Sequence, residues 1–256
     1  MSSNAHVKIC FVHEFLGQTK DWIPVIDSLE ENFELRTESL CLDLWNDETL
    51  GPHLSFQQWV NEYRQRLKAW AGHQPVYLVG SELGGRLLLH DFLQRSWEYA
   101  GACFLSVHPG FLDATERQKR WLEDQVWADR FELDPWSEVL GAWNSQPAFA
   151  GSPSILRAER EFDRVKMAES FRQWSVSKQE LDGFLQVDPP VMWVVGENDP
   201  ELKEQIGRLE QTGAPGIYRI LKNCGRRLLS DAPEQIAQSI GQFIRDVEYA
   251  RSQVPS

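Results

Sequence analysis

The sequence predicts an α/β protein in which a mostly parallel sheet is flanked by helices on both faces. Two observations carry this prediction. Short runs that are apolar almost throughout alternate with longer stretches whose apolar residues recur at helical spacing. Strand runs of this near-continuous apolar kind are typical of parallel sheets buried on both sides. A chain of 256 residues suits one domain, residues 1–256, with a sizeable core.

Six apolar runs are the expected strands, and they lie at residues 7–13, 35–44, 75–80, 102–110, 191–199 and 217–225. Runs such as VKICFVH, PVYLVG and VMWVVG carry the β-branched and aromatic residues that fit a pleated, buried surface. The first run ends in a turn, EFLGQTKD. These runs predict the core of the sheet.

Stretches with helical periodicity fill the intervals, and they lie at residues 22–33, 54–72, 84–96, 199–211 and 233–249. The second of them stops at Gly72, which suits a helix with a C-terminal glycine. The third follows the strand at 75–80 directly. Residues 111–185 break the alternation, because they are rich in charge and tryptophan and contain no convincing strand. We therefore expect a helical cap at about 111–185, inserted between two strands.

Charge and composition limit the partners. The formal charge of −12 argues against nucleic acid and anionic membranes, which attract basic surfaces. An anionic ligand would need a local cluster of arginines. No apolar run approaches the roughly 18–20 residues of a membrane span, and the N-terminus lacks the pattern of a signal peptide. The four scattered cysteines are expected to be buried free thiols in a reducing cytoplasm.

The stretch VYLVGSELGGR at residues 76–86 leads from a strand through a glycine-rich turn into a helix. A turn of this kind presents one side chain at the top of the sheet beside free backbone N–H groups. The helix N-terminus there favours developing negative charge. Nucleophilic serines use this G-x-S-x-G frame. In Gly80-Ser81-Glu82-Leu83-Gly84 the central position holds a glutamate instead.

In these motifs and their order the chain resembles the α/β-hydrolase fold family, and within it the 2-succinyl-6-hydroxy-2,4-cyclohexadiene-1-carboxylate synthases of menaquinone synthesis. The elbow LVGSELGGR is similar to that family's usual LVGYSLGGR. The other matching segments are FVHEFLGQTKDW (oxyanion loop), HPGFLDATERQKR, WADRF and AWNSQPAF (cap), GENDPELK (acid loop) and CGRRLLSDAPE (histidine motif). The resemblance runs through most of the chain and implies this fold.

The resemblance implies an incomplete catalytic triad. The nucleophile position holds Glu82, the acid position keeps Asp199, and the histidine position holds Leu229. The oxyanion-loop positions fall on Phe15 and Leu83. In addition, Glu14 replaces a glycine of the oxyanion loop.

The ligand-binding positions of the family are better kept. Arg86, Arg120 and Arg164 match arginines that bind a substrate carboxylate, and Trp143 matches a tryptophan of the pocket wall. Guanidinium groups bind carboxylates bidentately. Arg120 and Arg164 lie in ERQKR and RAEREFDR, whose alternating charges are also typical of exposed helix faces. Arg86 directly follows the elbow glycines.

Unusual chemistry remains as an alternative. Ser81 is a candidate for a shifted nucleophile, but it does not stand at the apex of the turn, and Val79 takes the place of the first glycine. Glu82 itself would form an ester, yet Leu229 supplies no base to activate the water that releases it. His108 is the remaining histidine that the alignment brings near the pocket, and local packing at a strand end is its simpler role.

Glu14, Glu82 and Asp199 also offer oxygen ligands for a hard cation such as Mg²⁺ or Ca²⁺. The nearby arginines oppose a cation, so we expect no metal and no cofactor. A buried carboxylate needs a partner, and an ion pair between Glu82 and one of the arginines is a simpler outcome.

The expected function is therefore that of a pseudoenzyme of this family. Its partner is expected to be a small carboxylated molecule or a protein. The alternative is an active lyase or hydrolase that uses non-standard groups. The residues that distinguish these two hypotheses are Glu82 and Leu229, which replace the family's nucleophile and histidine.

Overall fold

A six-stranded parallel sheet forms the centre of the computed structural model, which describes residues 6–33, 35–95, 98–111, 113–179 and 189–253. In sheet order the strands are β2 (Arg36–Leu42), β1 (His6–Val12), β3 (Val76–Ser81), β4 (Gly101–Leu105), β5 (Val191–Gly196) and β6 (Ile217–Leu221). Every pairing among these strands is parallel. The predicted α/β fold class is confirmed.

Helices cover both faces of the sheet. Ile9 and Phe11 of β1 belong to the apolar cluster shared with α1 (Ile23–Phe33) and α9 (Pro233–Ser252). Cys10 and Val12 point the other way, as alternation along a strand requires, into the cluster that contains residues of α2 and α3. The remaining elements of this part are η1 (Thr19–Trp22), α2 (Phe56–Ala71), α3 (Glu82–Arg95), α7 (Pro200–Gln211) and α8 (Leu228–Asp231).

Local sequence signals explain where these helices begin and end. Ser55 starts α2 with a capping box, in which its hydroxyl accepts from the Gln58 backbone N–H and the Gln58 side chain accepts from the Ser55 N–H. Gly72 ends the helix at a φ of +63°. Asp199 caps α7 and Pro200 occupies its first turn.

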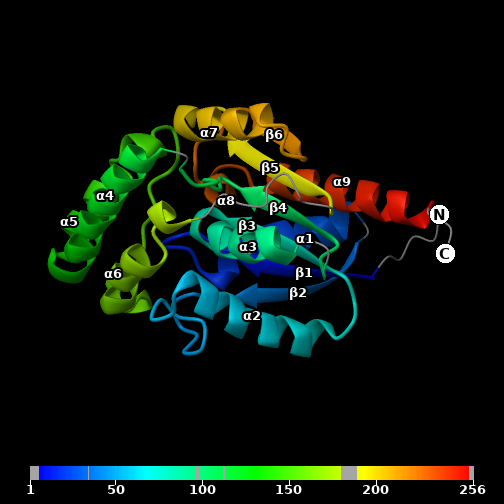
Figure 1. Cartoon of the computed structure of the whole chain (residues 1–256), viewed down its shortest axis with the longest axis horizontal. Helices are drawn as coiled ribbons and strands as arrows, with labels where there is room; N and C mark the ends of the chain where they lie inside the picture. The colour runs from blue at the N-terminus through cyan, green and yellow to red at the C-terminus, as the bar shows by residue number, and fades with distance from the viewer. Residues whose placement is uncertain (1–5, 34, 96–97, 112, 180–188, 254–256) are drawn as a thin grey trace.

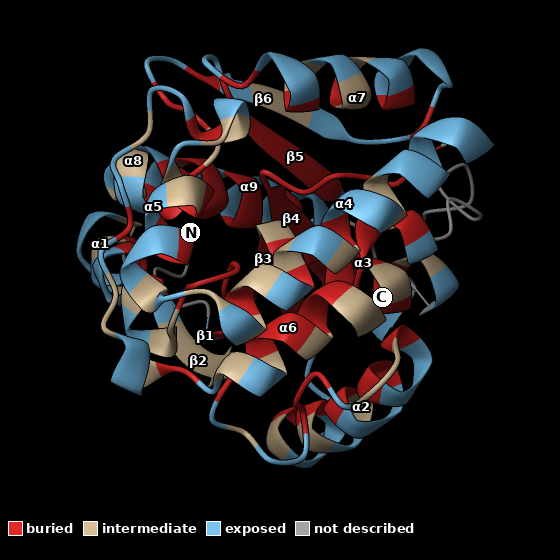
Figure 2. Cartoon of the chain, turned by 90° about the vertical axis from the view of Figure 1, so that its left-hand side faces the viewer, coloured by how far each residue is buried: buried red, intermediate tan, exposed pale blue. Residues whose placement is uncertain are grey.

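The segment between β4 and β5 is helical in its described part, residues 113–179. It contains α4 (Ala114–Leu133), α5 (Trp136–Asn144), η3 (Pro147–Phe149), η4 (Glu159–Glu161), α6 (Arg164–Gln173) and η5 (Val176–Lys178). These helices lie together beside the carboxyl ends of the strands (Figure 1). The outer face of α4 is exposed, whereas β4 and β5 behind it are buried (Figure 2). The expected end of the cap at residue 185 lies outside the described residues.

The order of the strands places two loops side by side. The chain leaves β1 for β2 at the sheet edge and then returns to β3 on the other side of β1. Val12 and Gly80 are paired in register at the carboxyl ends of β1 and β3. Open parallel sheets bind ligands at such a switch point. The loop with Glu14 and the turn with Glu82 therefore meet there.

Two expectations need adjustment in detail. The strands expected at 102–110, 191–199 and 217–225 end three to five residues early, because the last residues of each run form the loops at the carboxyl edge. Helix α3 begins at Glu82, two residues before the expected start at Gly84.

All four cysteines are free thiols, and three of them are buried. In the described part of the chain no helix is long and apolar enough to cross a membrane.

Candidate functional site

The turn between β3 and α3 has the geometry of a nucleophile elbow. Glu82 has a φ of +43°, a left-handed conformation that non-glycine residues rarely adopt. The glycines around it allow a close approach of backbones. A Cβ on Gly80 would lie 2.4 Å from the Gly85 Cα, and one on Gly84 would lie 2.4 Å from the His13 carbonyl oxygen. The elbow is therefore intact, although it presents a carboxylate.

The loop after β1 is held rigidly beside this turn. His13 is fully buried, and its Nδ1 donates to the Glu14 carbonyl at 2.9 Å while its Nε2 accepts from the Leu44 N–H at 3.1 Å. The Gly84 N–H donates to the His13 carbonyl at 3.1 Å. These bonds tie the loop to α3 and to the segment after β2. They fix the direction of the Phe15 backbone N–H.

Glu82 is bound by the oxyanion loop. Its Oε2 accepts a hydrogen bond from the Phe15 backbone N–H at 3.1 Å. Arg86 and Arg227 lie near enough for the charge of Glu82 to affect their pKa values, but neither forms an ion pair with it in the described structure. The expected ion pair between Glu82 and an arginine is thus replaced by a backbone partner. The glutamate thereby engages the backbone N–H that the resemblance assigns to oxyanion binding.

Glu14 is the second carboxyl group at the switch point. It is buried, and its Oε2 accepts from the Ser81 hydroxyl at 2.9 Å. Burial, then the charge of Glu82, raises the pKa of Glu14 to about 8. Glu14 therefore carries a proton at neutral pH. Ser81 is fully buried with its hydroxyl engaged by Glu14, and it precedes the residue at the apex of the turn, so it is poorly placed to attack a substrate.

The acid of the triad is held by an arginine. Both oxygens of Asp199 accept from Arg226, Oδ2 from Nε at 2.7 Å and Oδ1 from Nη2 at 3.0 Å. Glu201 binds the same Nη2 at 2.7 Å. Leu229 is buried in an apolar cluster with Leu228 and lines neither of the two cavities described below. Leu229 therefore provides no imidazole between Asp199 and Glu82.

Arg227 is a site residue that the sequence analysis missed. It is 2% exposed, and its guanidinium carbon lies 4.0 Å from the centre of the Phe149 ring. Its Nη1 donates to the Pro153 carbonyl at 2.8 Å, while Nη2 has no partner among the described residues. Burial lowers the pKa of Arg227, and the charges of Glu14 and Glu82 oppose this effect. The consecutive arginines after Gly225 were its only sequence signal.

A first small cavity lies between the two glutamates and the cap. It is lined by Glu14, Phe15, Glu82, Trp143, Phe149, Ile155, Arg226 and Arg227. Its open volume is about 10 Å³, which is room for about one water molecule.

The second cavity brings together most of the predicted ligand-binding residues. Arg86, Arg120 and Trp143 line it together with Glu82, Phe15 and Leu83. Its open volume is about 20 Å³, enough for one or two waters but not for a whole metabolite. The two cavities share Phe15, Glu82 and Trp143. These residues therefore lie together under the cap, which closes over them.

The two arginines of the second cavity, Arg86 and Arg120, have different hydrogen-bond partners. Arg86 is buried and donates through Nη1 to the Trp174 carbonyl. Burial lowers its pKa to about 10, so that it is still charged at neutral pH. Arg120 donates through Nε to Asp124 at 2.7 Å. Arg86 is buried, whereas the side chain of Arg120 is 27% exposed and pairs along its own helix.

Arg164 lies outside both cavities. Its Nε donates to the Phe131 carbonyl at 2.7 Å, and Nη2 donates to the Asp134 carbonyl. Its third contact is an ion pair with Glu159. Arg164 therefore joins α6 to the end of α4 inside the cap, and the structure does not bring it to the other predicted ligand-binding residues.

Aromatic packing closes the cap over the oxyanion loop. The Phe15 ring lies 4.8 Å from Trp143 and 4.8 Å from Phe171, measured between ring centres. Arg157 adds polar contacts from the cap to the same loop, to the Leu16 carbonyl at 3.1 Å and to Asp21 at 2.5 Å. A ligand larger than a carboxylate group would have to displace these contacts.

The metal alternative finds no support in the geometry. Glu14 and Glu82 do approach each other, but Asp199 is bound by Arg226 on both oxygens. Within the described ranges, no three histidine, cysteine or acidic side chains are placed to share a metal ion.

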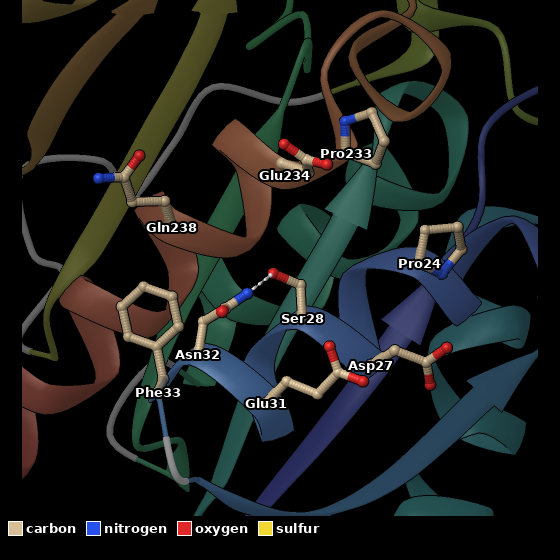
Figure 3. A pocket seen from close by; sticks show the side chains of 9 residues that line it. All are labelled: Pro24, Asp27, Ser28, Glu31, Asn32, Phe33, Pro233, Glu234 and Gln238. Atoms are coloured by element: carbon tan, nitrogen blue, oxygen red, sulfur yellow. Dashed lines mark hydrogen bonds between the residues drawn. The ribbon is translucent and has the colours of Figure 1, made fainter.

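A larger hollow lies on another part of the surface, between α1 and the start of α9 (Figure 3). Its volume is about 500 Å³, and Asp27, Glu31 and Glu234 contribute carboxylates to it. The Asn32 amide donates to the Ser28 hydroxyl at 2.9 Å across its floor. None of the predicted site residues lines this hollow, so it is separate from the switch-point site.

Comparison with known proteins agrees with this architecture. The model of the alpha/beta hydrolase family matches residues 12–239, which is most of the chain. The chain belongs to the alpha/beta hydrolase family. Within it, 2-succinyl-6-hydroxy-2,4-cyclohexadiene-1-carboxylate synthase from Klebsiella pneumoniae is 26% identical over 250 residues, covering 92% of this chain and 93% of the relative. The synthase from an Enterobacter species is also 26% identical, over 244 residues, covering 93% and 91%.

The solved structure of MenH from S. aureus superposes with a TM-score of 0.81 at 15% identity and covers 94% of both chains. At that identity the likeness concerns the fold. The chain is thus an alpha/beta hydrolase of the same overall shape as this protein. The elbow and the loop after β1 lie at the carboxyl ends of the strands, where open α/β sheets bind ligands.

Proposed function

We propose that this alpha/beta hydrolase is a catalytically inert relative of the 2-succinyl-6-hydroxy-2,4-cyclohexadiene-1-carboxylate synthases that keeps a pocket for a small carboxylate. The hydrogen bond from the Phe15 N–H to Glu82 carries the proposal. It places a carboxyl group where a reaction would develop negative charge. A substrate oxygen has no access to that N–H while Glu82 occupies it.

The surrounding groups support the same conclusion. A nucleophile needs a base within hydrogen-bond reach, and Arg226 engages both oxygens of Asp199. Leu229 lies in the apolar core. The chain differs from the family motifs at Glu14, Glu82 and Leu229. The fold tolerates these residues, because each side chain has a hydrogen-bond partner or apolar neighbours.

Retention of carboxylate binding rests on Arg86 and Arg120. Both line the same small cavity under the cap, and Arg86 stays charged at neutral pH although burial lowers its pKa to about 10. Low dielectric strengthens such charge-assisted hydrogen bonds. The aromatic walls, Phe15 and Trp143, suit an apolar body behind the carboxylate, once the cap moves outward.

One observation favours an active enzyme as the second candidate. Glu14, with its pKa raised to about 8, is an acid that exchanges its proton near neutral pH, as general acids do. In that case Glu82 would accept a proton or attack a substrate. The two candidates differ in whether Glu82 is needed for turnover.

Two assays test the proposal. The purified protein is incubated with p-nitrophenyl acetate and with the substrate of the Klebsiella synthase. We expect no hydrolysis and no 2-succinyl-6-hydroxy-2,4-cyclohexadiene-1-carboxylate above background. Turnover that disappears in Glu82→Ala and persists in Glu62→Ala, an exposed control on α2, refutes inertness. Binding is tested with succinate, which should raise the melting temperature of the wild type and of Arg36→Ala but not of Arg86→Ala.

A further inference from the structure

The outer face of α4 carries a row of exposed apolar side chains. Leu122, Val126 and Leu133 are 56%, 59% and 77% exposed. The buried residues of the helix, among them Ala128 and Phe131, lie on its opposite side and pack into the cap. Single exposed apolar residues are normal on a protein surface, whereas several in a row along one helix indicate a binding surface.

The spacing of this row is that of a seam between two helices. Asp129 completes the row, so that its positions follow one another at intervals of four, three and four residues. Such intervals keep side chains on one side of a helix, and they are the intervals of a coiled-coil seam. A second helix laid along α4 would therefore cover all three apolar side chains at once.

Four charged residues flank the row on one side. Lys119 pairs with Glu123 at 3.9 Å, and Arg130 pairs with Asp134 at 2.9 Å. The partners of each pair are four residues apart, and the second pair follows the first by eleven residues, which is about three turns of a helix. All four side chains thus share one side of α4. In chain order their charges are positive, negative, positive and negative.

This order of charges is self-complementary in one orientation only. In a second copy of α4 that lies antiparallel to the first, the order is reversed. Glu123 then faces Arg130 of the second copy. In the same register Lys119 faces Asp134 of the second copy. Parallel helices would place each charge opposite its own equivalent, which is repulsive. A two-fold axis perpendicular to the helices produces the antiparallel pair, and two-fold symmetry is the commonest in protein dimers.

The same register matches the apolar row. Leu122 meets Leu133 of the second copy, and Val126 lies close to the axis, beside Asp129 of the second copy. Arg172 holds Asp129 at 3.2 Å. A polar residue in a seam fixes the register at a cost in stability. One face of a helix of 20 residues, about 30 Å long, makes a small interface, which is typical of weak dimers.

We propose that the outer face of α4 is a docking surface for a second copy of this chain, which binds through an antiparallel pair of α4 helices. The occupant follows from the charges, because the flanking row complements its own reversed order. The apolar row supplies the area that this contact buries. The contact joins the outer faces of two caps, and it does not depend on the proposed carboxylate pocket.

Sedimentation velocity of the full chain over a range of micromolar concentrations tests the docking surface. We expect the wild type to dimerise as its concentration rises and Val126→Glu to remain monomeric. Glu123→Lys and Arg130→Glu should each weaken the dimer more than about tenfold, because each places like charges opposite one another. The control Ile220→Glu, at an exposed position of β6, should dimerise as the wild type does.

A mixture of the two charge variants tests the register. Glu123→Lys and Arg130→Glu should associate with each other, since the mixture restores opposite charges at both contacts. Misfolding of either variant would not produce this recovery. A mixture that stays monomeric while the wild type dimerises overturns the antiparallel register, and a wild type that is monomeric at every concentration overturns the docking surface. A dimer that persists in Val126→Glu but is lost in Ile220→Glu also rejects the proposal, because it places the contact at β6.

Discussion

The carboxylate of Glu82 lies against the backbone N–H of Phe15, with its Oε2 3.1 Å from the nitrogen. This contact joins the nucleophile position of the elbow to the oxyanion loop that faces it. A negative group is well placed there, since Glu82 begins α3 and the positive end of a helix favours it. The elbow persists as a structural turn, and its side chain occupies the space in which chemistry would take place.

Glu14 makes the stability of the protein depend on pH. Its folded-state pKa is about 8 and its ordinary value is 4.5, so the unfolded chain releases the proton first. The stability that protonated Glu14 contributes is complete below pH 4.5 and is lost as the pH rises towards 8. At about 1.4 kcal/mol per pKa unit, the loss is a few kcal/mol.

Urea unfolding of the wild type and Glu14→Gln at several pH values measures this effect. The glutamine still accepts from Ser81 but does not titrate. The free energy of unfolding of the variant should therefore rise relative to that of the wild type between pH 5 and 8. Glu62→Gln, at an exposed position, should follow the wild type. Parallel pH profiles for the wild type and Glu14→Gln would show that Glu14 is ionised in the folded protein.

The ion pair of Asp199 and Arg226 is expected to be costly to break. The Asp199 side chain is 1% exposed and that of Arg226 is 12% exposed. Arg226→Met leaves a buried carboxylate with its charge uncompensated, which should cost about 3–5 kcal/mol. Asp199→Asn with Arg226→Met should cost less than the sum of the single changes. Additive losses in urea unfolding would mean that the two side chains do not interact.

The glycines of the elbow offer a direct steric test. A Cβ on Gly84 would lie 2.4 Å from the His13 carbonyl oxygen and 2.5 Å from that of Val12. These are backbone atoms of β1 and its loop, and they yield little. Gly84→Ala should therefore destabilise the protein by about 1–3 kcal/mol.

Gly141 is the matched control, because it lies in α5 with open space around its Cβ position. Gly141→Ala should stabilise the protein by about 0.5–1 kcal/mol through helix propensity. The two melting temperatures should move in opposite directions. A tolerated Gly84→Ala would mean that β1 and α3 lie farther apart at this point.

Much of the fold was predictable because burial leaves a strong pattern. A run such as VYLVG is apolar throughout since both faces of β3 are covered, and its position next to β1 follows from the parallel topology. The start of α3 was less accessible. Helix α3 begins directly at Glu82, which has a left-handed backbone conformation. Nothing in the sequence pattern indicates that a glutamate adopts this conformation.

The site was predictable where family position and local geometry coincide. Arg86 and Trp143, which the resemblance assigns to the pocket, both line the second cavity. Arg164 shows where family position fails as a guide. Its guanidinium donates to carbonyls at the end of α4 instead of lining the cavity. Arg227 was missed because two adjacent arginines look alike in sequence, and only the packing against Phe149 turns one of them inward.

Rebuilding two triad positions should not restore activity. Glu82→Ser frees the Phe15 N–H, and Leu229→His returns an imidazole to the histidine position of the family. However, Asp199 remains bound by Arg226 on both oxygens, so the imidazole would lack its orienting acid. Leu229 is also part of an apolar cluster, where an unpaired imidazole should cost about 1–3 kcal/mol. We therefore expect a destabilised double variant with no hydrolysis of p-nitrophenyl acetate, whereas turnover present only in the double variant would show that the histidine position still communicates with the elbow.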